Sequence, residues 1–220
     1  MKKLIIVICF LTFGFYGYSQ YADMDQVNPE YIKVLEGRTA KFLKPLELGD
    51  KFDEVQGIVI EQYCNLSAIH DTCGVKKKSV RTLDISNEEK DQLIFDYENE
   101  RDAHLYIRHN HFIAQLLGAG LTYEQVDEIK NGMTYGVFPN TYKSFLDMLL
   151  DLTDEQKQFI WSALYEARER AMDQSESDDK HKMFGKYKGR INNYLSKQGY
   201  DLNAESKAWH ERMRKAGIDF

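Results

Sequence analysis

Apolar residues recur every three or four positions along most of the chain, which is the spacing that one buried face of an α-helix requires. A first predicted helix begins at Asn28 and Pro29, and its apolar positions are Ile32, Leu35, Ala40, Phe42 and Leu43. A second follows a predicted N-cap at Asp50, and its buried face comprises Val55, Ile58, Val59, Gln62, Tyr63, Leu66 and Ile69. No alternating strand pattern of useful length occurs, so the pattern predicts an all-α protein.

Three capping boxes mark further helix starts, because a Ser or Thr followed three residues later by Glu or Gln can satisfy two free backbone N–H groups. The boxes span residues 86–89, 122–125 and 153–156. The first opens a long helix that should end near Leu117, the second a short helix, and the third a helix that should end near Gln174. Helical spacing also covers residues 140–150, 178–197 and 203–216. The lysine-rich segment Gly74–Ile85 predicts a charged loop. The expected architecture is a single multi-helix bundle of seven or eight helices.

The first residues have the composition of a secretory signal peptide. Lys2 and Lys3 precede an apolar run over residues 4–15, and small residues at Ser19 and two positions earlier suit a cleavage site. We therefore expect a signal peptide over residues 1–19, a single all-helical domain over residues 20–220, and a periplasmic or secreted protein. No later apolar run is long enough to cross a bilayer, so no membrane anchor is expected.

The charge balance bears on the class of partner. The chain has 29 Lys and Arg against 35 Asp and Glu, a formal net charge of −6. Loss of Lys2 and Lys3 with the signal peptide would bring this charge to −8. Nucleic-acid binding requires clustered cations that neutralise phosphates, so a nucleic-acid partner is not expected.

Two cysteines, Cys64 and Cys73, follow the predicted signal peptide. On one straight helix their spacing corresponds to about 13 Å of rise, beyond the roughly 7 Å between Cα atoms that a disulfide tolerates. A disulfide would need the helix to break near Thr72, where Gly74 makes a break possible. A disulfide and two free buried thiols are therefore both open.

The stretch FGKYKGRINNYL, residues 184–195, has the spacing of a helix rather than of a phosphate-binding loop. Its apolar stripe contains Phe184, Tyr187, Ile191 and either Tyr194 or Leu195, and a polar face carries Lys186, Arg190 and Asn193. The two glycines, Gly185 and Gly189, weaken a helix. Their presence fits either close packing of a neighbouring helix or the approach of a ligand.

Carboxylates gather on the preceding predicted helix, where Glu166, Glu169 and Asp173 share one face with Arg170. Such a cluster can accept hydrogen bonds from sugar hydroxyls, hold a metal ion, or divide acid and base roles. It can equally form a solvated face of ion pairs with nearby cations, Arg168 among them. His109 and His111 point to different sides of a helix and no HExxH motif occurs, so no metal site and no cofactor are expected.

Aromatic residues surround a proline in GMTYGVFPNTYKSFLDML, residues 132–149. Tyr135 and Tyr142 could offer flat faces on which a sugar ring stacks. The alternative is a hydrophobic plug that covers one end of the helical bundle.

Three segments together resemble a known family: GMTYGVFPNTYKSFLDMLLDLTDEQK, EARERAMD and KHKMFGKYKGRINNYLSKQGYDL. The chain is similar to domain-of-unknown-function family 3826, exported proteins found mainly in polysaccharide-degrading Bacteroidetes, for which sugar binding has been suggested. The resemblance covers nearly all of the chain after the signal peptide and is densest from His104 to Trp209. Family members continue as a helix after the segment that matches Ala68–Asp71, whereas Thr72, Cys73, Gly74 and the following lysines predict a break here.

The resemblance and the motifs together predict an exported carbohydrate-binding protein associated with polysaccharide use, with acidic sugars as candidate ligands. In the predicted cleft, Tyr135 and Tyr187 stack on sugar rings. Carboxylates accept hydrogen bonds from the sugar hydroxyls, and cations and amides donate hydrogen bonds to the sugar. The predicted ligand-binding residues are Tyr135, Tyr142, Glu166, Glu169, Asp173, His181, Lys186, Tyr187, Arg190 and Asn193. One alternative is a glycan-active hydrolase or lyase that uses the 166–173 carboxylates. Another is a helical scaffold without a small ligand. The sequence does not define an oligomeric state.

Overall fold

The computed structural model describes residues 21–217, and within this range the chain forms eight α-helices and no strand. The helices are α1 (Pro29–Leu43), α2 (Phe52–Arg81), α3 (Asn87–Gly118), α4 (Tyr123–Met133), α5 (Val137–Met148), α6 (Asp154–Ala171), α7 (Ser177–Lys197) and α8 (Leu202–Lys215). The predicted all-α class is thus confirmed. The predicted signal peptide lies outside the described residues. Among the described helices, none is both long and apolar enough to cross a membrane.

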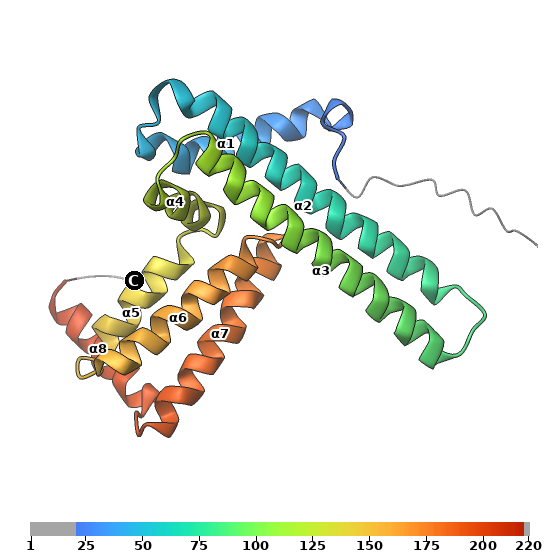
Figure 1. Ribbon diagram of the computed structural model, residues 1–220. Coiled ribbons are helices and arrows are strands. Elements are labelled where there is room, and N and C mark those ends of the chain that lie inside the picture. The colour runs from blue at the N-terminus through green and yellow to red at the C-terminus, as the bar shows by residue number, and fades with distance from the viewer. Residues whose placement is uncertain (1–20, 218–220) are drawn as a thin grey trace, which may run out of the picture.

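The helices form two groups (Figure 1). In the first, α2 and α3 make a long antiparallel hairpin, and α1 and α4 pack near one end of it. In the second, α6 and α7 pack side by side along their length, with α5 and α8 against them. The connection between α6 and α7 lies against α3, so the second group meets the first part-way along the hairpin (Figure 1).

Each group has its own apolar core. Leu35, Val59, Phe112 and Ile129 are fully buried in the first core, one on each of its four helices. The second core contains the apolar stripe predicted for residues 184–195, packed against α5 and α6. Complete burial of an aliphatic or aromatic side chain stabilises a fold by about 1.5–3 kcal/mol, so these stripes decide which helix faces turn inward.

Local capping chemistry places most helix starts where the sequence predicts them. Ser86, Thr122 and Thr153 each form both hydrogen bonds of a capping box, and Asn28 caps α1 ahead of Pro29. The predicted cap at Asp50 is wrong. That residue lies inside a short 3-10 helix, Gly49–Lys51, which runs directly into α2 without a side-chain cap.

The predicted loop at Gly74–Ile85 is also wrong over most of its length, because α2 continues without a break to Arg81. Its lysines are held along α3: Lys76 pairs with Glu100 at 2.6 Å, and Lys77 pairs with Glu98. Cys64 and Cys73 are therefore separated along one continuous helix, and both are free, buried thiols. The disulfide alternative is excluded.

Candidate functional site

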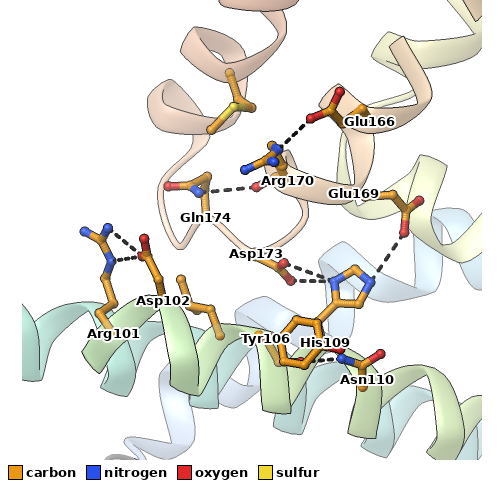
Figure 2. A pocket seen from close by; sticks show the side chains of 12 residues that line it. Arg101, Asp102, Tyr106, His109, Asn110, Glu166, Glu169, Arg170, Asp173 and Gln174 are labelled. Carbon is orange, nitrogen blue, oxygen red and sulfur yellow. Dashed lines mark hydrogen bonds and ion pairs between the residues drawn. The ribbon is translucent and has the colours of Figure 1, made fainter. Parts of the chain in front are cut away.

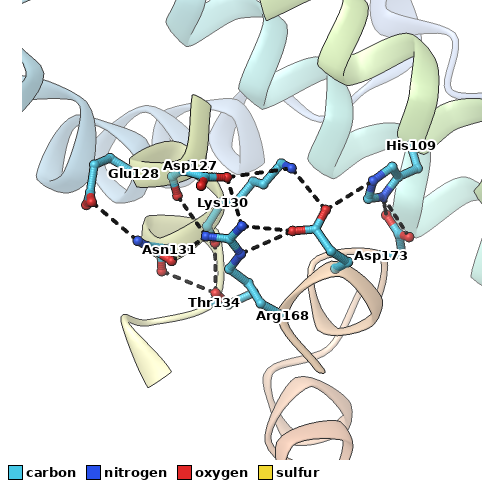
Figure 3. A network of polar contacts seen from close by, with 9 residues as sticks. His109, Asp127, Glu128, Lys130, Asn131, Thr134, Arg168 and Asp173 are labelled. Atoms are coloured by element: carbon cyan, nitrogen blue, oxygen red, sulfur yellow. Dashed lines mark hydrogen bonds and ion pairs between the residues drawn. The ribbon is translucent and has the colours of Figure 1, made fainter. Parts of the chain in front are cut away.

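A buried polar seam joins the two helix groups, and Arg168 of α6 is its centre (Figure 3). Only 1% of this residue is exposed. Its guanidinium donates hydrogen bonds to the carboxylate of Asp127 at 2.8 Å, to the amide oxygen of Asn131 at 2.9 Å and to Glu169 at 3.0 Å. A buried guanidinium needs such partners because its desolvation is costly. Arg168 thereby fixes α6 against α4.

Glu169 is shared by three cations in the seam. It accepts hydrogen bonds from Arg168 and from Lys130 Nζ at 3.0 Å, and it lies 3.4 Å from Nε2 of His109. Burial opposes ionisation of this carboxyl, but the hydrogen bond from His109 and the charge of Lys130 outweigh it and lower the pKa to about 2. Glu169 is therefore a permanent anion that organises the seam.

His109 of α3 lies between two carboxylates of the other helix group. Its Nδ1 is 3.0 Å from Asp173, and its Nε2 faces Glu169 (Figure 2). Burial disfavours the imidazolium, but the hydrogen bonds to Asp173 and Glu169 prevail and raise the pKa of His109 to about 9. The histidine is thus a cation at neutral pH and donates from both nitrogens. A further hydrogen bond, 2.8 Å long, joins His70 Nε2 to the backbone oxygen of Asp173.

A groove of about 610 Å³ opens beside the seam. One wall is α3, which contributes Arg101, Asp102, Tyr106, His109 and Asn110, and the other comes mainly from α6 and the segment after it (Figure 2). Tyr106 is the exposed aromatic residue of this groove, with 72% of its surface accessible. The seam anchors both walls, because His109 of α3 lies 3.4 Å from Glu169 of α6.

The charged side chains of the groove are paired. Arg101 lies 2.7 Å from Asp102, and Arg170 lies 3.1 Å from Glu166. Glu166 also accepts a hydrogen bond of 2.6 Å from the hydroxyl of Tyr187, and this bond is the main reason that its pKa is lowered. A carboxylate held in this way stays ionised at neutral pH and is a poor proton donor.

The structure brings together only part of the predicted site. Glu166, Glu169 and Asp173 line the groove. Tyr187 is buried in the second core and does not line the groove, although its hydroxyl donates to Glu166, which does. Arg190 lies over the ring of Tyr187 and 3.5 Å from Glu166. The remaining predicted residues do not line the groove: Lys186 and Asn193 are exposed, Tyr142 packs on the second core, and Tyr135 and His181 stack on each other.

Sequence reasoning missed the α3 wall. Asp102, Tyr106 and Asn110 are four residues apart and share a helix face, which is the signal that the sequence does offer. That spacing shows an exposed face with mixed polar and aromatic character, but not the helix that it faces. The pairing of α3 with α6 depends on His109 and Asp173, which are 64 residues apart in sequence.

No group of three or more His, Cys, Asp or Glu side chains suited to a metal ion occurs in the part of the chain that the structure describes. The fold and groove together define an all-helical protein with two cores, a charged seam and an open polar groove. The sequence matches the family described as "Protein of unknown function (DUF3826)" over residues 32–215, and the chain belongs to this family. A search of curated proteins gave no match.

Proposed function

We propose that this protein binds a carbohydrate in the groove between α3 and α6. The observation that carries the proposal is the exposed ring of Tyr106 in a groove otherwise lined mainly by planar polar side chains. An aromatic face packs well on the CH face of a pyranose, and carboxylates, amides and guanidinium groups exchange hydrogen bonds with its hydroxyls. A signal peptide as predicted would bring the protein to the periplasm or the exterior, where polysaccharide fragments occur.

The charge pattern of the groove favours a neutral sugar. Arg101, Arg170 and His109 are each compensated by a carboxylate at 3.1 Å or less. An anionic ligand would have to compete with these ion pairs, whereas hydroxyl groups can share the remaining lone pairs and N–H groups. For the hydrolase alternative, the hydrogen bond from Tyr187 lowers the pKa of Glu166 and makes it a poor acid, whereas burial raises the pKa of Asp173, which leaves Asp173 as the carboxyl suited to that role.

Calorimetric titration with neutral tetrasaccharides of glucose, xylose and mannose at millimolar concentration tests the proposal. We expect one of them to bind and the Tyr106→Ala variant to bind it about five-fold more weakly, since an aromatic stacking contact contributes on the order of 1 kcal/mol. Tyr123→Ala is the matched control, because Tyr123 is equally exposed, at 74%, but lies outside the groove. The proposal fails if no tetrasaccharide binds, or if the two variants bind alike.

A further inference from the structure

A second cavity, of about 700 Å³, lies between α1, α2 and α4. None of the residues that line it lines the groove. Its wall combines three aromatic rings, those of Phe42, Tyr63 and Tyr135, with two cations, Arg38 and Lys41. No carboxylate belongs to this wall. In a chain with a net charge of −6, a cavity with only positive charges on its wall is unexpected.

The two cations are available to a ligand. Arg38 and Lys41 are exposed and three residues apart on α1, so they project from the same face. Within residues 21–217 neither forms an ion pair, in contrast to the arginines of the groove. Arg38 instead contacts an aromatic ring: its guanidinium lies 5.7 Å from the ring centre of Tyr63.

A third cation lies close to the same ring. Lys180 of α7 is 2% exposed, and its Nζ lies 5.1 Å from the ring centre of Tyr63. Its ammonium donates a hydrogen bond of 3.1 Å to the backbone oxygen of Met133. Burial and the charge of Arg38 lower the pKa of Lys180 to about 8, although Asp173 and Glu176 act in the opposite direction. An anion bound near Arg38 would offset the repulsion between these two cations.

Tyr135 supplies an exposed ring at the cost of backbone strain. It follows α4 at the position where a Schellman motif favours glycine, and its φ is +59°. The motif is complete: Tyr135 N–H donates to Gly132 O at 3.2 Å, and Gly136 N–H donates to Asn131 O at 2.8 Å. The ring is 47% exposed and stacks on His181, with centroids 5.5 Å apart and planes 12° apart. A strained residue with an exposed ring on a cavity wall is typical of a functional position.

We propose that the cavity between α1, α2 and α4 binds a carboxylate carried on a ring, of which a uronic acid is the expected example. Arg38 and Lys41 hold the carboxylate, and Tyr135 contacts the ring. The arrangement suits this ligand because the guanidinium and ammonium groups supply charge-assisted donors and the aromatic rings supply apolar area. This site is independent of the carbohydrate groove and stands or fails separately from it.

The full chain without its predicted signal peptide should be titrated with digalacturonate, with its uncharged counterpart galactobiose, and with 4-hydroxybenzoate. We expect digalacturonate to bind and galactobiose to bind at least ten-fold more weakly in this cavity. Binding of 4-hydroxybenzoate in place of digalacturonate would retain the site for ring carboxylates and assign it to aromatic acids. If neither carboxylate binds, or if galactobiose binds the Tyr106→Ala variant as well as digalacturonate does, the proposal is overturned.

Variants then locate the site. Arg38→Gln combined with Lys41→Gln should weaken carboxylate binding at least ten-fold, and both residues are exposed, so the fold should be retained. The matched control is Lys33→Gln with Lys44→Gln, which removes the same charge near the two ends of α1, away from the cavity wall. Equal loss of affinity in both double variants would show a non-specific charge effect and would overturn the assignment.

Tyr135→Gly should affect stability and carboxylate affinity differently. Glycine relieves the left-handed strain, so the unfolding temperature should not fall, while loss of the ring should weaken carboxylate binding about five-fold or more. Unchanged affinity would remove Tyr135 from the site. Tyr106→Ala should leave carboxylate binding intact, which separates failure of this site from failure of the carbohydrate groove.

Discussion

Arg168 and Lys180 are both buried cations at the junction of the two helix groups, yet their surroundings differ. Arg168 donates to Asp127, Glu169 and Asn131. Lys180 donates to one backbone carbonyl and otherwise faces the ring of Tyr63. The first cation is neutralised inside the seam, whereas the second adds positive potential behind a cavity that already carries two unpaired cations.

The contrast separates structural charge from charge available to a ligand. In the seam, carboxylates and cations are hydrogen-bonded to one another, so the seam fixes how the two groups meet. Around Tyr63, cations are held near one another without a carboxylate on the cavity wall. Of these cations Lys180 is the buried one, and an anionic ligand near Arg38 would offset the repulsion between Lys180 and Arg38.

The largest expected effect is that of Arg168→Met. Loss of the guanidinium leaves Asp127 and Glu169 with fewer partners, and breaking a buried pair in this way lowers the free energy of unfolding by about 3–5 kcal/mol. Arg170→Met on the same helix is the control, because its ion pair with Glu166 is exposed and contributes about 0.5 kcal/mol or less. Denaturant titration measures both, and equal losses would contradict the structural role of the seam.

His109 should give stability a pH dependence. A pKa raised from 6.5 to about 9 means that the folded state binds the proton more tightly, so the contribution is complete below pH 6.5 and disappears as pH rises through 9. A shift of this size corresponds to about 3 kcal/mol. His109→Gln should lack the loss between pH 6.5 and 9.

Unfolding measured at several pH values tests the role of His109. The exposed His181 provides the control, since His181→Gln should keep the wild-type profile. A wild-type profile that is flat from pH 6.5 to 9 would contradict the pairing of His109 with both carboxylates.

Lys180→Met should have a smaller and opposite effect. Replacing a cation whose burial is poorly compensated by an apolar side chain of similar size should raise the free energy of unfolding by about 1–2 kcal/mol at pH 7. Because the pKa of Lys180 is lowered to about 8, wild-type stability gains a contribution from this group as pH rises from 8 to 10.5. The variant should lack that gain, and a destabilised variant would show that Lys180 is compensated better than its contacts indicate.

The helix positions were largely predictable because their determinants are local. Capping boxes at Ser86, Thr122 and Thr153 act within one helical turn, and apolar spacing acts within a few turns. The extension of α2 beyond Gly74 was not predictable in this way. A run of lysines beside a glycine predicts a loop from local sequence. The segment is helical here because Lys76 and Lys77 form ion pairs with Glu100 and Glu98 of α3.

Only the α6 wall of the candidate site was predictable from the sequence. The face that carries Glu166, Glu169 and Asp173 follows from helical spacing, and these residues do line the groove. Tyr106 lies on a helix about sixty residues away in sequence, and spacing does not show which exposed faces meet.

The direction of the Tyr135 ring was also not predictable from the sequence. Its sequence context suggests an aromatic platform, but the left-handed turn at the end of α4 turns this ring toward α1, α2 and His181.

The sequence by itself determined where most helices begin, which faces are apolar and where charge accumulates, since each of these depends on residues one to four positions apart. Only the tertiary structure decided which faces pair, which cations are neutralised and which cavities form. The reason is physical: the free energy of a charge or an exposed ring depends on groups within a few ångströms in space, and here those groups come from helices far apart along the chain.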